Sequence, residues 1–169
     1  LPNVYVMGAG HVGRAIAELL QHLPVRCILV DTRAAEVALC TADVETRVSA
    51  IPEVDIATAP AGSAFVVLTH DHGLDFLLTS AALERGDAAY VGMIGSKRKI
   101  KMIYRDLLDQ GISQQALDAV YAPLGIDIGS QTVAEIAVSI CAELVAHRNL
   151  EGEVPGRPAT ISVADIEDE

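Results

Sequence analysis

The chain lacks tryptophan, and only two phenylalanines and four tyrosines supply aromatic rings among its 169 residues. Single-stranded nucleic acid is bound largely by stacking bases on aromatic side chains, so this composition argues against such a role. Basic residues are also few, because 12 lysines and arginines stand against 23 acids and give a net charge of −11. A nucleic-acid backbone needs a basic face, and we therefore expect no nucleic-acid partner.

Long apolar runs and paired cysteines are missing as well. No apolar stretch reaches the roughly 18 residues that a membrane span needs, so we expect no membrane partner. The three cysteines, Cys27, Cys40 and Cys141, are odd in number and match no zinc spacing, which indicates reduced thiols in a cytoplasmic protein and no metal site. With 51% hydrophobic and 21% charged residues, the composition is that of a globular domain.

Short apolar runs alternate with helical patterns along most of the chain. Strands are expected at 3–7, 25–30, 64–69 and 88–91, and the segment 44–48 is a candidate short strand. Strands joined by helices pair in parallel through right-handed crossovers, and uniformly apolar strands indicate a sheet covered on both faces. The predicted fold is therefore α/β, a doubly wound, mainly parallel, Rossmann-like sheet in three α/β/α layers.

The predicted domain occupies residues 1–148, and the segment 149–169 differs from it in character. That segment has six acids and one arginine, and Pro155 and Pro158 interrupt it, so we expect a mobile, solvated acidic tail. At the other end, a strand-like run follows Leu1 and Pro2 at once. This opening indicates the C-terminal part of a longer protein.

A glycine motif joins the first predicted strand to the first predicted helix. The segment Gly8-Ala9-Gly10-His11-Val12-Gly13 matches G-x-G-x-x-G, the turn that binds dinucleotides when a strand precedes it and a helix follows. Gly8 permits the tight turn, Gly10 lets a pyrophosphate approach the backbone, and Gly13 allows close packing of the helix. The helix N-terminus then offers N–H groups to an anion. The alternative is a Rossmann fold that keeps its glycines for packing and binds nothing.

An acid closes the second predicted strand, where such folds bind ribose. Asp31 follows Gly8 by 23 residues and can accept hydrogen bonds from ribose hydroxyls, which favours NAD over NADP. Arg33 nearby can instead hold a 2′-phosphate, so both dinucleotides stay open.

A second glycine turn precedes a basic helix. The segment 92–99 (GMIGSKRK) lies between a strand and a helix, and Ser96 is the expected N-cap. The amides after Gly95, together with Ser96 and Lys97, make a candidate phosphate or carboxylate site. A solvated basic face that balances nearby acids is the alternative.

Histidines gather at the predicted carboxyl ends of strands, where open α/β sheets bind ligands. His70 and His72 follow the strand at 64–69, and His11 lies in the glycine motif. Three interpretations remain open: metal ligation, acid–base chemistry or ligand contact, and hydrogen bonding within the loops. Asp71 and Asp75 are candidates to orient an imidazole. Asp127, in a later glycine-rich loop, either faces the same crevice or stabilises its own turn.

Four segments taken together resemble the C-terminal Rossmann domain of the XdhC/CoxI family, from about Val4 to Ala146. They are residues 8–13 (GAGHVG), 68–72 (LTHDH), 90–99 (YVGMIGSKRK) and 125–129 (GIDIG) followed by 134–137 (AEIA).

The resemblance implies an accessory, chaperone-like role in the maturation of xanthine dehydrogenase or a related molybdenum hydroxylase. Such proteins bind molybdenum cofactor, a molybdopterin, and pass it to the apo-enzyme after its terminal sulfur is installed. A cysteine desulfurase is then a further expected partner, and a homodimer is a common state of open α/β domains. The resemblance also implies a further N-terminal domain with cysteine motifs, which we expect to lie outside these 169 residues.

Two other functions compete with this one. An NAD(P)-dependent oxidoreductase would have His70 or His72 as its general base. A regulatory module that senses NAD, like the domains that gate potassium transporters, would bind the cofactor without turnover.

Overall fold

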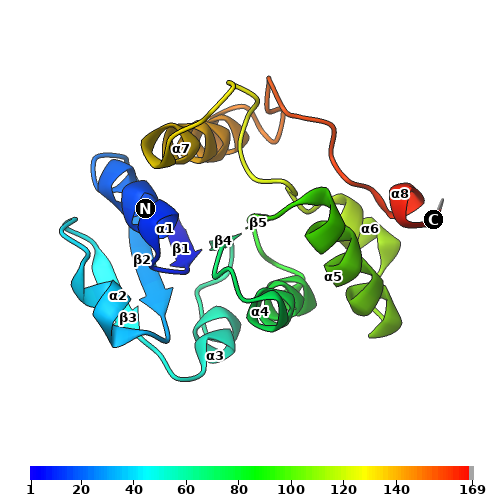
Figure 1. Cartoon of the computed structure of the whole chain (residues 1–169), viewed down its shortest axis with the longest axis horizontal. Helices are drawn as coiled ribbons and strands as arrows, with labels where there is room; N and C mark the ends of the chain where they lie inside the picture. Colours follow the sequence, from blue (N-terminus) through cyan, green and yellow to red (C-terminus); the bar gives the residue numbers. More distant parts are fainter. Residues whose placement is uncertain (168–169) are drawn as a thin grey trace.

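The computed structural model describes residues 1–167, which form one parallel sheet covered by helices on both faces (Figure 1). Within these residues the sheet has five strands in the order β3-β2-β1-β4-β5, and every neighbouring pair is parallel. This confirms the predicted doubly wound α/β fold. The strands are β1 Asn3–Met7, β2 Arg26–Asp31, β3 Glu45–Val48, β4 Ala64–Val67 and β5 Tyr90–Met93.

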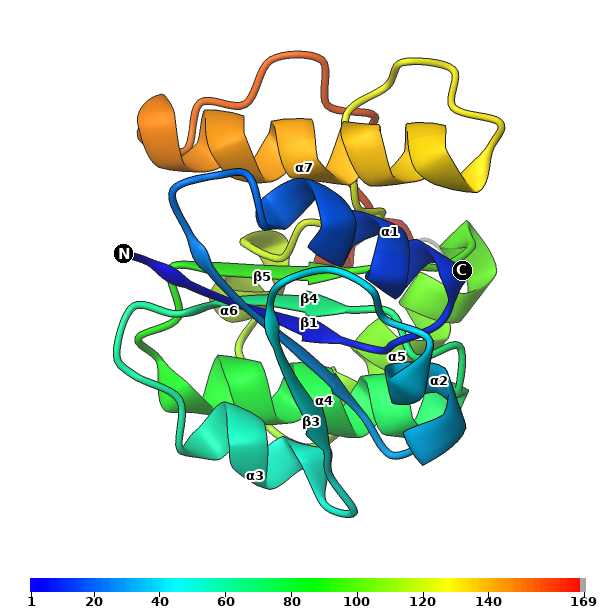
Figure 2. The same ribbon diagram turned by 90° about the vertical axis from the view of Figure 1, so that its left-hand side faces the viewer.

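The helices lie in two layers, with α1 and α7 on one face of the sheet and α3 and α4 on the other (Figure 2). Alternation along β1 separates the two cores, because Val4 and Val6 pack toward α1 and α7 while Tyr5 and Met7 pack toward the opposite layer. The helices are α1 His11–Leu20, α2 Ala34–Ala38, α3 Pro52–Ala57, α4 His72–Arg85, α5 Lys97–Asp109, α6 Gln114–Asp118, α7 Val133–Asn149 and α8 Val163–Glu167. No helix in the described part of the chain is long and apolar enough to cross a membrane.

The strand order places a topological switch point between β1 and β4. From β1 the chain moves outward through β2 to β3, and it then returns to the other side of β1 to build β4 and β5. In open α/β sheets, ligands bind where this reversal separates the loops at the carboxyl ends of the strands.

Polar side chains cap the helices that start at this edge. Ser96 accepts the N–H of Lys99 at 3.2 Å, and Asp71 accepts the N–H of Leu74 at 2.9 Å. Thr132 and Glu135 form a capping box at the start of α7. These caps supply acceptors for N–H groups that a helix cannot bond internally.

Several boundaries differ from the predicted ones. The strand expected at 88–91 runs instead over Tyr90–Met93, because Gly92 and Met93 continue the ladder with β4 rather than forming a turn. Between 32 and 62, two helices, α2 and α3, flank the expected short strand, and their five and six residues are too few for a clear apolar period.

The segment expected as a solvated tail is packed against the domain through much of its length. Ile161, Val163 and Ile166 are buried in the core that α5 and α6 also line. The net charge of the segment concealed these three apolar residues, whose burial removes them from water. Residues 168–169, which belong to the same expectation, lie outside the described part.

Arg157 anchors this segment to the rest of the domain. Its guanidinium donates to Glu143 on α7 at 2.5 Å and to the carbonyl oxygens of Pro123 and Gly125 at 2.7 and 2.8 Å. Glu143 is fully buried and also accepts the hydroxyl of Tyr90. A basic residue in an acidic segment thus has a buried partner that neutralises it.

Candidate functional site

The glycine loop lies at the carboxyl end of β1, beside the start of the loop that follows β4. Gly8 has a φ of +134°, and a Cβ there would stand 2.5 Å from the carbonyl oxygen of Leu68. At Gly13 a Cβ would stand 1.8 Å from the carbonyl oxygen of Gly8. Because these neighbours are backbone atoms that cannot rotate away, both glycines are needed for the fold itself.

Gly10 differs from the other two glycines of the motif. It is the N-cap of α1 with an ordinary φ of −72°, and no side chain caps this end of the helix. An added Cβ would meet only the Arg33 guanidinium, at 4.0 Å. The space in front of Gly10 is thus open, and packing does not explain the glycine. Val12 and His11 of the same motif differ in exposure: the Val12 side chain is buried in the core, whereas His11 is exposed.

Asp31 ends β2, and its carboxylate is hydrogen-bonded to the backbone of the glycine loop. Its carboxylate accepts the N–H of Ala9 at 2.7 Å, and it accepts the N–H, Nε and Nη2 of Arg33 at 2.9, 3.0 and 2.9 Å. Burial by itself raises the pKa of Asp31, but the hydrogen bonds from Arg33 and Ala9 outweigh it and hold this pKa below its ordinary value. The acid predicted to bind ribose is therefore an ionised internal partner of the loop.

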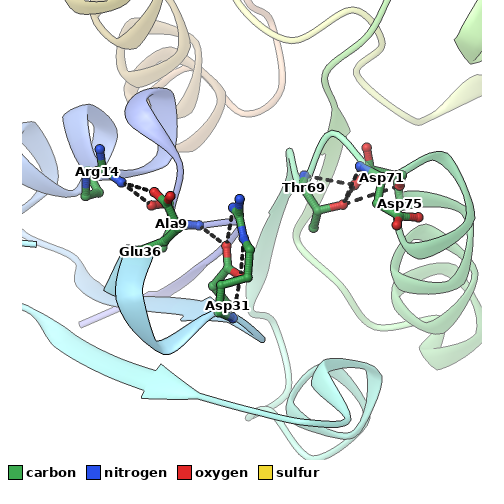
Figure 3. A network of polar contacts seen from close by, with 8 residues as sticks. Ala9, Arg14, Asp31, Glu36, Thr69, Asp71 and Asp75 are labelled. Carbon is green, nitrogen blue, oxygen red and sulfur yellow. Dashed lines mark hydrogen bonds and ion pairs between the residues drawn. The ribbon is translucent and has the colours of Figure 1, made fainter. Parts of the chain in front are cut away.

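Arg14 is a residue of this site that sequence reasoning did not find. From α1 it donates to the carbonyl oxygen of Ala9 at 2.7 Å and to Glu36 on α2 at 2.6 Å. The backbone of Ala9 is thus held at both its N–H and its carbonyl, as Figure 3 shows for the Asp31 and Arg14 sides. A basic residue one position after the glycine motif was the signal in the sequence.

The loop after β4 forms the other side of the site. Figure 3 shows Thr69, Asp71 and Asp75 grouped there, across from Asp31 and Ala9. Asp75 is fully buried and accepts the N–H and the hydroxyl of Thr69 at 2.9 and 2.5 Å, and Lys99 of α5 donates to its second oxygen. Asp71 caps α4. Both carboxylates are therefore bound to other groups, and their expected role in orienting an imidazole does not match these contacts.

The three histidines border the site without forming a metal centre. His70 is exposed with a left-handed φ of +67°, and His72 is half-buried at the first residue of α4. His11 lies 3.3 Å from Arg14 through its Nδ1. Within residues 1–167, no three histidine, cysteine, aspartate or glutamate side chains are grouped to hold a metal ion. The position of the three histidines at the edge of the site leaves them available to contact a ligand.

The basic helix α5 presents its cations in two directions. Lys99 turns inward to Asp75, whereas Lys97 and Arg98 are exposed and line, with Lys101, Met102 and Arg105, a shallow hollow of about 630 Å³. Gly95 has a φ of +153° before the Ser96 cap. The N-terminus of this helix thus reaches the site through Lys99, whereas Lys97, Arg98 and Arg105 are exposed and Lys101 is half-buried.

Asp127 lies in a different loop, at the start of α7. Its N–H donates to the carbonyl oxygen of Gly156 at 2.6 Å, and its side chain is exposed. It lines, with Ile128 and Ser130, a hollow of about 270 Å³. The contacts of Asp127 are therefore with the C-terminal segment rather than with the glycine loop.

Two further cavities, of about 610 and 400 Å³, lie at the amino ends of β4 and β5, opposite the glycine loop. Tyr90 and His147 line both, and Tyr90 stacks on Tyr121 at 4.8 Å between ring centroids. Burial lowers the pKa of His147 and is the main cause that raises the pKa of Tyr90 well above its ordinary value. Sequence reasoning missed the cluster of Tyr90, Tyr121 and His147. Its buried acid, Glu143, which accepts the hydroxyl of Tyr90, lies among the apolar residues of α7 in the sequence.

The three cysteines are free, and two of them are buried. Burial raises the pKa of Cys27 and of Cys141 to about 12. Since the thiolate is the nucleophile and the metal ligand, a pKa this high keeps both thiols in the protonated, weakly nucleophilic form at neutral pH.

Comparison with known proteins gives one family over most of the chain. The family model described as the XdhC Rossmann domain matches residues 4–144. The protein YqeB of Escherichia coli strain K12 is 26% identical over 159 residues, which is 88% of this chain and 28% of that protein. A Bacillus subtilis strain 168 protein, named as a probable subunit of xanthine dehydrogenase, is 26% identical over 153 residues, 87% of this chain and 43% of that protein.

A solved structure shares the fold. The crystal structure of a xanthine dehydrogenase from Bacillus halodurans superposes with a TM-score of 0.72 and 22% identity, over 91% of this chain and 44% of that one. The chain thus spans less than half the length of each of these relatives.

Proposed function

The chain belongs to the XdhC Rossmann domain family, and from this membership we propose that it is the cofactor-binding part of an accessory protein for a molybdenum hydroxylase. The proposed client is xanthine dehydrogenase or a related enzyme, in keeping with the names of the relatives. The proposed ligand is molybdenum cofactor. The three free thiols are in keeping with a cytoplasmic place for this step.

The observation that carries the proposal is the open space at Gly10. A phosphate can approach the backbone only where no Cβ intervenes, and Gly10 is the glycine of this motif that packing does not require. The N-terminal amides of α1 point to this space, and the Arg33 guanidinium borders it. These groups suit the phosphate of a molybdopterin.

The other side of the switch point suits the rest of such a ligand. A pterin is flat and carries several hydrogen-bond donors and acceptors. The loop Thr69–His72 follows β4 directly, and it presents an exposed and a half-buried imidazole. The pair of Asp75 and Lys99 holds this loop to α5, so its backbone is fixed before a ligand arrives. Bound cofactor would supply the molybdenum chemistry in the client, while this chain's residues would bind, orient and shield it.

Binding to the purified chain, measured by calorimetry without oxygen, tests the proposal. Molybdenum cofactor, NAD and NADP are titrated separately into the wild type, Gly10→Leu and the control Ala61→Leu, whose exposed side chain lies at the amino end of β4. Tight binding of molybdenum cofactor that Gly10→Leu abolishes and Ala61→Leu keeps would support the proposal. Binding of NAD or NADP alone would contradict it.

NAD(P) is the second candidate ligand, because the same loop geometry suits a pyrophosphate. An oxidoreductase and a sensing module are then separated by one assay, in which candidate hydride donors are added and nicotinamide absorbance is followed. Reduction indicates an oxidoreductase, and binding without reduction indicates a module. Size measurement in solution tests the proposed homodimer, and co-purification with a cysteine desulfurase tests that proposed partner.

A further inference from the structure

The carboxylate of Asp31 is fully used by the chain's own donors. It accepts one hydrogen bond from Ala9 and three from Arg33, all between 2.7 and 3.0 Å. An ionised carboxylate has about four lone-pair sites for hydrogen bonds. A ribose diol could therefore bind to Asp31 only by displacing the Arg33 guanidinium, and the usual assignment of this acid to NAD does not suit the geometry.

Arg33, by contrast, is presented toward the open part of the loop. Its side chain is 50% exposed while that of Asp31 is 5% exposed, so the cation and not the anion faces outward. Its Nη2 lies 4.0 Å from the point where a Cβ on Gly10 would stand. An anion that approaches Gly10 therefore meets this guanidinium.

The contacts with Asp31 also hold Arg33 ready. Nε and Nη2 both donate to the carboxylate, which orients the planar group and leaves other N–H donors for a ligand. A guanidinium forms strong, often bidentate hydrogen bonds to phosphate. Because Asp31 also binds the N–H of Ala9, the cation and the loop backbone are fixed relative to each other.

We infer that Arg33 is a specificity-determining residue that selects a ligand with a phosphate monoester beside Gly10 over a ligand with a free ribose diol. This inference rests on the proposed binding of a phosphate-bearing cofactor at the glycine loop. It favours the molybdopterin form that ends in a phosphate monoester. Among nicotinamide dinucleotides it favours NADP over NAD.

The matched pair of NADP and NAD tests the inference, because the two differ by one phosphate monoester on the ribose. The wild type should bind NADP at least about tenfold more tightly than NAD, as expected for charge-assisted hydrogen bonds. In Arg33→Ala this ratio of dissociation constants should fall to about one or invert, because Asp31 is then free to accept ribose hydroxyls. Arg26→Ala is the control, since Arg26 lies at the amino end of β2, the strand that Asp31 ends, and pairs with Glu45.

Loss of structure would weaken the binding of NADP and NAD alike. A shift of the ratio of their dissociation constants toward NAD therefore reports a change in specificity. A ratio near one in the wild type, or a preference for NADP that Arg33→Ala keeps, would overturn the inference. So would failure of both dinucleotides to bind. None of these outcomes decides whether molybdenum cofactor binds, which the titration of that cofactor measures separately.

Discussion

The buried pair of Asp75 and Lys99 makes a strong prediction for stability. Lys99→Met keeps the length of the side chain but removes the charge, and it leaves a fully buried carboxylate without its cation. Removing one partner of a buried pair costs about 3–5 kcal/mol. The side chain of Lys99 is 19% exposed, so in the variant water can reach this position and partly solvate the carboxylate of Asp75. We therefore expect a loss at the lower end of this range, about 3 kcal/mol in the free energy of unfolding.

Urea unfolding followed by far-ultraviolet circular dichroism measures this loss, since the chain has no tryptophan for fluorescence. Asp75→Asn is the matched variant, because an amide oxygen can still accept the N–H of Thr69 and the exposed part of Lys99 can turn to water. It should cost about 1–2 kcal/mol. The double variant should be more stable than the sum of the two losses predicts. A loss below about 1 kcal/mol for Lys99→Met, or simple additivity, would refute the buried-pair interpretation.

Three further predictions concern the glycine motif, Asp31 and the C-terminal segment. Gly13→Ala should destabilise the fold by about 2 kcal/mol or more in urea unfolding, because its Cβ would overlap a backbone oxygen, whereas Gly10→Ala should change stability by about 1 kcal/mol or less; equal losses would contradict this distinction. The lowered pKa of Asp31 means that its stabilisation is complete above the ordinary aspartate pKa of about 4 and is lost as pH falls toward the folded value, so the stability difference between wild type and Asp31→Asn should shrink below about pH 4. A difference that is constant between pH 7 and 3 would show that the charge of Asp31 is not responsible. Arg157→Ala should lower the unfolding free energy by about 3–5 kcal/mol by stranding the buried charge of Glu143, and a thermal midpoint within about 2 °C of the wild type would contradict the anchoring.

The fold was predictable because its signals are local. The strand at 3–7 is an apolar run that ends at a glycine, and the strand expected at 64–69 is an apolar run of which residues 64–67 form β4. The capping box at Thr132 likewise uses residues only three apart. Such patterns need no knowledge of distant contacts. Helices as short as α2 and α3 show too few turns for a periodic pattern, and tertiary packing decides them.

The positions of the candidate residues were predictable, but the hydrogen bonds among them were not. The glycine motif and the expected strand ends predicted Gly10, Asp31 and His70 at the carboxyl edge of the sheet, and the structure places them there. The pairing of Asp75 with Lys99 joins residues 24 positions apart, and no spacing rule links an acid in one helix to a cation in the next. The apolar residues of the C-terminal segment were likewise visible, but only the packed domain shows the surface that buries Ile161.

The arrangement of these bonds bears on the proposal that this acidic protein binds an anion. A net charge of −11 repels phosphate at long range, so the local field at the loop must be neutral or positive for binding. The two buried acids at this edge, Asp31 and Asp75, each accept a backbone N–H from a site loop and each have a cation of their own, Arg33 and Lys99. Their charges are thus cancelled within the chain, and the carboxylates serve to fix the loops. The groups left to contact the proposed ligand are then hydrogen-bond donors: the helix amides, the outward part of Arg33 and the imidazoles beside β4.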